Sequence, residues 1–101
     1  MWVLVMFDLP VVEAEERKAA NQFRKDIKLC GFTMMQLSVY IRHAASDENA
    51  QVHLKRVKGL LPPKGEVRAI LITDKQFERM QIFYGKMSKP PKPAPKQLEF
   101  L

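Results

Sequence analysis

The sequence predicts an α+β fold of the ferredoxin-like, split βαβ type, with two helices covering one face of a small sheet. The order of patterns along the chain is strand, helix, strand, helix, strand, followed by a short last strand and a tail. The two helical segments have similar lengths, and each carries one apolar stripe. Such a sheet leaves one face and at least one edge uncovered, so we expect a homodimer to cover them.

Length and composition indicate an ordinary globular domain. The 101 residues are 47% apolar and 28% charged, and no apolar run is long enough to span a membrane. The first seven residues are too short for the core of a signal peptide. A single cysteine, Cys30, excludes an internal disulfide and a cysteine-based zinc site. We therefore expect a cytoplasmic protein without membrane contact.

The net charge of +6 suggests a polyanionic partner, most often nucleic acid. Part of this charge belongs to the tail. Without residues 86–101, 13 basic residues face 10 acidic ones, so the folded part is only mildly basic. The positions of the cations must therefore decide whether nucleic acid binds.

The first predicted element is a strand over residues 2–7, whose continuous apolar run is typical of burial on both faces. Asp8 follows at its tip, and Pro10 stops the ladder because proline has no N–H to donate. A carboxylate in this position needs a cation, a donor or a proton. Asp8 is therefore a candidate metal-binding or phosphate-directed group. The alternative is that it caps the following loop through its own backbone.

A helix is predicted over residues 13–30. Its buried stripe comprises Ala20, Phe23, Ile27 and Cys30. The acidic first turn suits the positive end of the helix dipole, and Gly31 suits the C-terminal cap.

A strand over residues 33–42, kinked or split in two, follows from alternating polarity. One face would carry Met35, Leu37, Val39 and Ile41, and the other Met34, Gln36, Ser38 and Tyr40. We expect Met34 and Tyr40 on the face without helices, where dimerisation would cover them.

The second helix begins at Ser46 or Asp47 and ends at the Pro62-Pro63 pair. Its seam is Ala50, Leu54, Val57 and Leu61. A strand over 66–73, a single helical turn around 75–78 and a short strand over 81–84 complete a domain of residues 1–86. Residues 87–96 form a Pro/Lys-rich linker, and 97–101 form a C-terminal docking strand.

The first helix carries a basic strip. Arg17, Arg24 and Lys28 lie within about 40° of one another on a helical wheel, roughly opposite the apolar stripe, with Lys18 and Lys25 alongside. Acidic residues gather on another side, so the strip is either a phosphate-binding surface or an ordinary solvated face. Arg42, at a strand end, could reach a phosphate or pair with Asp47.

Catalytic motifs are few. The chain has no HExxH, Walker loop, GxSxG or His/Cys ligand cluster. We expect His43 and His53 to be surface or capping groups. One carboxylate cannot hold a divalent cation, because Mg²⁺ requires several oxygens. A two-fold axis near the strand tips would supply a second Asp8.

Several short motifs in order resemble one family, CRISPR-associated protein two, the small dimeric partner of the CRISPR spacer integrase. They are Met6-Phe7-Asp8-Leu9-Pro10, the basic first helix, Gln36-x-Ser38-Val39-Tyr40 and Ile82-Phe83-Tyr84-Gly85. Phe32-Thr33-Met34 and the segment from Ile72 to Phe77 are most similar to members from systems with a single large RNA-guided effector nuclease. The resemblance covers residues 1–86.

The resemblance implies a homodimer whose last strands cross onto the partner's sheet, and an Asp8 pair around Mg²⁺ or Mn²⁺. It implies metal-dependent endonuclease activity on RNA or duplex DNA, and a scaffold that joins integrase dimers during spacer acquisition. By position, Arg17, Lys18 and Arg24 would contact the DNA backbone. Two hypotheses remain: a phosphodiesterase with a catalytic Asp8 pair, and a non-catalytic DNA-binding scaffold whose Asp8 is structural. We favour the scaffold as the main role.

Overall fold

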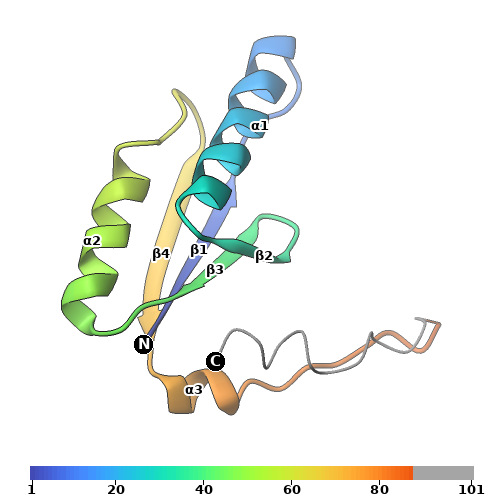
Figure 1. Ribbon diagram of the computed structural model, residues 1–101. Coiled ribbons are helices and arrows are strands. Elements are labelled where there is room, and N and C mark those ends of the chain that lie inside the picture. Colours follow the sequence, from blue (N-terminus) through green and yellow to red (C-terminus); the bar gives the residue numbers. More distant parts are fainter. Residues whose placement is uncertain (88–101) are drawn as a thin grey trace.

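The computed structural model describes residues 1–87 (Figure 1). A four-stranded antiparallel sheet has the strand order β2-β3-β1-β4. Helices α1 and α2 pack on one side of it, so the predicted α+β, split βαβ fold is confirmed. Beyond Met87, the predicted linker and the predicted docking strand over 97–101 lie outside the described residues. The elements are β1 (Trp2–Asp8), α1 (Ala14–Leu29), β2 (Thr33–Gln36), β3 (Val39–His43), α2 (Asp47–Lys58), β4 (Glu66–Ile72) and α3 (Asp74–Glu78).

Strand β1 is the centre of the sheet and pairs with β3 on one side and β4 on the other. Val3, Val5 and Phe7 point toward the helices and are buried in the core. Leu4 and Met6, on the other side, are only partly buried. The expected burial on both faces is therefore only half correct, because α1 and α2 cover one face and nothing within residues 1–87 fully buries Leu4 and Met6 on the other.

Helix α1 begins and ends close to its predicted bounds, because the residues that cap it lie next to its two ends in the sequence. The Glu16 carboxylate accepts a hydrogen bond of 2.8 Å from the backbone N–H of Glu13 at the start of the helix. Gly31 takes a φ of +87° just after the end, which ordinary side chains rarely adopt. Ala20, Phe23 and Ile27 form the buried stripe, and the Phe23 and Phe7 rings meet edge to face with centroids 5.2 Å apart.

Residues 33–42 form a hairpin, so the predicted split is confirmed. Ser38 has a φ of +65° in the turn, and the register shifts between Met34 and Gln36. The shift interrupts the expected alternation of sides. Tyr40 lies in the helix-covered core, 1% exposed and stacked near Phe7, so its predicted place on the uncovered face is wrong. Leu37, expected on a buried side, is 84% exposed in the turn.

Helix α2 starts as expected, with the Ser46 hydroxyl accepting from the Asn49 N–H at 3.1 Å. It ends at Lys58 with Gly59 as its cap, four residues before the proline pair, so Leu61 is outside the seam and half exposed. His53 joins Ala50 and Val57 on the buried face. None of the helices within residues 1–87 is both long enough and apolar enough to cross a membrane.

Strand β4 and helix α3 match their predicted ranges. Thr73 caps α3, accepting from the Gln76 N–H, and Phe77 stacks on Trp2 with ring centroids 4.2 Å apart. Residues 81–85 form no strand, so the predicted strand over 81–84 is wrong for the single chain. Phe83 and Tyr84 are exposed there, and no neighbouring strand in the described part of the chain pairs with them.

The side of the sheet opposite α1 and α2 is called the open face here. Because residues directly opposite in a ladder share a side, the register assigns it residues from all of the longer strands. They are Trp2, Leu4, Met6 and Asp8 of β1, Val39, Ile41 and His43 of β3, and Glu66, Arg68, Ile70 and Ile72 of β4. Helix α3 covers the Trp2 end, and the open face becomes charged at the Asp8 end.

Candidate metal and nucleic-acid site

Asp8 lies at the last position of β1, on the open face and exposed to solvent. Glu66, the first residue of β4, is directly opposite it in the ladder, which places the two Cβ atoms about 5 Å apart. Like charges in this arrangement repel. Arg68, on the same side of β4, forms an ion pair with Glu66 and offsets part of the repulsion.

One chain supplies only part of a metal site. Carboxylate oxygens such as those of Asp8 and Glu66 are the ligands that Mg²⁺ and Mn²⁺ prefer. No group of three or more His, Cys, Asp or Glu side chains within residues 1–87 could hold a metal ion. The donor chemistry therefore fits a divalent cation only if another copy adds its own carboxylates.

Glu66 and Arg68 were missed by the sequence interpretation. Both belong to a strand that was predicted, but nothing local indicates which residue of β4 lies opposite Asp8. The partner follows from the antiparallel register, which is a property of the assembled sheet.

Arg17 is positioned by the loop that joins β1 to α1. Its guanidinium donates to the carbonyl oxygens of Val11 and Val12, at 3.2 and 2.6 Å. These contacts hold the cation at the same end of the sheet as Asp8. They also give Arg17 a structural role, since it ties down a loop whose two valines are exposed.

Arg24 lies on a flank of α1 and not opposite the apolar stripe. Its guanidinium carbon is 5.6 Å from the centre of the Phe7 ring, and its side chain is half-buried. Lys18 and Lys28 are exposed, and no hydrogen bond or ion pair involves their side chains within the described residues. The strip from Arg17 to Lys28 extends for about 16 Å along the helix.

Arg42 makes a contact that the sequence did not predict. Its guanidinium donates 2.5 Å to the Cys30 carbonyl oxygen at the end of α1, and its side chain is part-buried. It therefore satisfies a free carbonyl at a helix C-terminus. The predicted pairing with Asp47 is not formed within residues 1–87. Phosphate binding by Arg42 stays a prediction.

The two histidines have opposite environments. His43 is exposed, with its Nε2 atom 3.3 Å from an Asp74 carboxylate oxygen, as expected of a surface group. His53 is 3% exposed, and neither ring nitrogen has a partner among the described residues, so its predicted surface location is wrong. Burial, together with the positive charges of Arg42 and Arg56, lowers the pKa of His53.

Known proteins resemble the chain in sequence and in fold. The sequence model of the family described as CRISPR associated protein Cas2 matches residues 1–80. A protein of Parvibaculum lavamentivorans named CRISPR-associated endoribonuclease Cas2 is 52% identical over 99 residues, which are 98% of each chain. A protein of Flavobacterium psychrophilum with the same name is 52% identical over 86 residues, covering 85% of this chain and 75% of that one.

A solved structure agrees with the architecture. The crystal structure of Streptococcus pyogenes Cas2 at pH 6.5 superposes with a TM-score of 0.60. The match covers 83% of this chain and all of that chain at 21% identity, so it bears on the fold alone.

Proposed function

The chain belongs to the Cas2 family of CRISPR-associated proteins, and from this premise we propose that it is an adaptation protein that binds duplex DNA. As a homodimer, it would bridge dimers of the spacer integrase during spacer acquisition. We include in the proposal a weak, metal-dependent endonuclease activity on RNA or duplex DNA. The relatives' printed name, endoribonuclease, supports this part.

The observation that carries the proposal is the open face. Beyond the Trp2 end, which α3 covers, it is a largely apolar and partly exposed sheet surface that ends in an exposed carboxylate. Exposed apolar surfaces of this kind mark protein–protein contacts. The exposed segment with Phe83 and Tyr84 supports the same conclusion, because these rings would be buried if the segment paired with a second copy's sheet.

A two-fold axis at the charged end of the open face would bring two Asp8 carboxylates together. They would hold Mg²⁺ or Mn²⁺, which when bound lowers the pKa of a coordinated water and stabilises charge on a phosphate. Asp8 would position the ion. Glu66, paired with Arg68, would lie beside the site without adding net charge to it.

Duplex binding would use the outer layer of the dimer. Helix α1 packs on the side of the sheet away from the open face, so its basic strip stays accessible after dimerisation. Lys18 and Lys28 are free to contact phosphates. Arg17 and Arg24 would contact phosphates in addition to their roles in the fold.

The second candidate is a purely non-catalytic scaffold with a structural Asp8. It is favoured by the small number of groups available for chemistry. Within residues 1–87 no third acid or histidine converges on Asp8 and Glu66 to serve as a general base. A single symmetric metal without such a base is a poor nuclease.

The test compares wild-type protein with Asp8→Asn and with Glu48→Gln, an exposed acid on α2 that serves as the matched control. Light scattering should show dimers for all three proteins. Cleavage of RNA and duplex DNA in Mg²⁺ should be lost only in Asp8→Asn. Cleavage at the wild-type rate in that variant would remove Asp8 from the mechanism, and spacer acquisition that tolerates the variant would select the scaffold. A monomeric wild-type protein would refute the shared site.

A further inference from the structure

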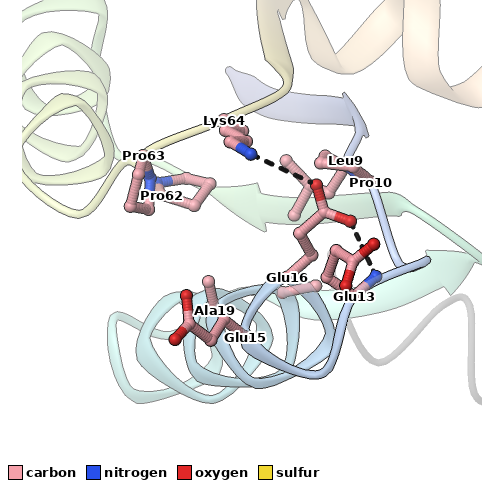
Figure 2. Close-up of a pocket in the computed structure, with 10 residues that line it drawn as sticks. Leu9, Pro10, Glu13, Glu15, Glu16, Ala19, Pro62, Pro63 and Lys64 are labelled. Carbon is pink, nitrogen blue, oxygen red and sulfur yellow. Dashed lines mark hydrogen bonds and ion pairs between the residues drawn. The ribbon is translucent and has the colours of Figure 1, made fainter.

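A pocket of about 140 Å³ opens where the start of α1 faces the loop between α2 and β4. Figure 2 shows its residues, which come from two parts of the chain, residues 9–20 and residues 62–64. The apolar wall consists of Leu9, Pro10, Ala19, Ala20, Pro62 and Pro63. The polar rim consists of Glu13, Glu15, Glu16 and Lys64.

The size of the pocket decides the class of ligand. Sites for nucleotides and other drug-sized molecules measure about 300–1,000 Å³. A volume of about 140 Å³ is well below that range and suits one amino-acid side chain. The walls are aliphatic and proline-rich, so the inserted part is expected to be a hydrocarbon stem.

The charges on the rim determine whether the ligand is expected to be positively or negatively charged. Glu16 is already engaged, because it accepts from the Glu13 N–H and lies 3.7 Å from the Lys64 ammonium. These contacts, with the Glu13 N–H first, lower the pKa of Glu16 and keep it ionised. The Glu15 carboxylate, in contrast, has no hydrogen bond or ion pair within the described residues, and Figure 2 shows it beside Ala19 at the rim.

Three carboxylates face one ammonium here, so the pocket carries a net charge of −2 on a chain of net charge +6. Such a surface repels DNA phosphates. The pocket also lies in the helix layer, whereas the open face is on the other side of the sheet. A dimer formed through the open face would therefore leave the pocket free.

We propose that this pocket is a docking site for a protein partner that inserts a Lys or Arg side chain. The aliphatic stem would pack against Leu9, Pro62 and Pro63, and the cationic head would pair with Glu15 at the rim. The inference rests on the proposed function for the identity of the partner, which is the spacer integrase. The charge of the pocket favours this occupant over nucleic acid.

The test measures binding of the purified integrase to wild-type protein and to Glu15→Lys, with Glu48→Lys as the control of equal charge change. Glu15→Lys should bind at least about tenfold more weakly, since it replaces an attraction by a repulsion. The control should bind like wild type. Both variants should bind duplex DNA as well as wild type or better, because each adds a positive charge.

A charge-neutral variant, Ala19→Leu, fills the pocket and should weaken integrase binding without changing DNA binding. If Glu15→Lys loses the fold, as judged by thermal unfolding, Ala19→Leu and Glu15→Gln decide the question. Wild-type protein that fails to bind integrase would overturn the proposed function together with this inference. Normal wild-type binding that the pocket variants share would overturn the inference alone.

Discussion

His53 makes the stability of this fold depend on pH below about 7, where the unfolded histidine binds a proton. The ring is 3% exposed on the buried side of α2, and neither nitrogen has a partner among the described residues. Its pKa is lowered from 6.5, first by burial and then by the charges of Arg42 and Arg56. The folded state therefore prefers the neutral ring, whereas the unfolded chain binds a proton near pH 6.5. Stability should be full above this pH and should fall as the pH decreases.

The size of the effect follows from linkage. At pH values between the pKa of His53 in the folded state and its pKa in the unfolded state, the free energy of unfolding falls by at most about 1.4 kcal/mol for each pH unit. If the buried ring stays neutral, moving from pH 6.5 to 5.5 removes about 1 kcal/mol. In a domain of this size the melting temperature should fall by about 4–8 °C.

The assay is urea unfolding at pH 8.0, 6.5 and 5.5 for wild type, His53→Leu and His43→Gln. His53→Leu should lose the decrease between pH 6.5 and 5.5, and His43→Gln, which changes the exposed histidine, should keep it. A nuclear magnetic resonance titration of the His53 ring provides an independent measurement if His53→Leu is unstable. Equal pH slopes for wild type and His53→Leu, or a ring that protonates near pH 6.5, would refute the reasoning.

Three further predictions concern the strip and the packing. Replacing both Lys18 and Lys28 by Ala should reduce the slope of log affinity for duplex DNA against log salt concentration by about 0.9 per lost phosphate contact, while the free energy of unfolding stays the same. A salt titration that shows no change in this slope would leave both lysines as ordinary solvated groups. Gly31→Ala should lower the free energy of unfolding in urea by about 1–3 kcal/mol, because Gly31 has a φ of +87° and a new Cβ would clash with the Arg42 guanidinium. A loss below about 0.5 kcal/mol would contradict this. Phe77→Ala should lower the free energy of unfolding by about 2 kcal/mol or more and shift the fluorescence emission of Trp2, the only tryptophan of the chain. Unchanged fluorescence would show that the two rings do not stack in solution.

Local signals were sufficient for most of the elements. The apolar run before Asp8, the helix after Glu13, the cap at Thr73 and the glycine at 31 each depend on residues a few positions apart. Their bounds were therefore predicted to within a residue or two. The end of α2 was placed too late because Gly59 closes the helix before the prolines are reached.

The side of the sheet or helix on which a residue lies could not be predicted from such local signals. Tyr40 enters the core and Leu37 leaves it because a turn and a register shift separate β2 from β3. His53 is buried because α2 lies against the sheet with that side inward. A one-residue shift in a strand reverses every following side chain, and no local pattern reports such a shift.

The residues of the candidate site also fall into those that the sequence indicated and those that only the structure placed. The sequence by itself indicated Asp8 as the exceptional carboxylate, and it located the cations of α1, because both follow from composition and short-range spacing. Only the tertiary structure placed Glu66 opposite Asp8, Arg42 on the end of α1, and residues 9–20 and 62–64 around one acidic pocket. The physical reason is that strand pairing and helix docking are set by the burial of the whole core, which joins residues far apart in the chain and leaves no trace in the neighbourhood of any one of them.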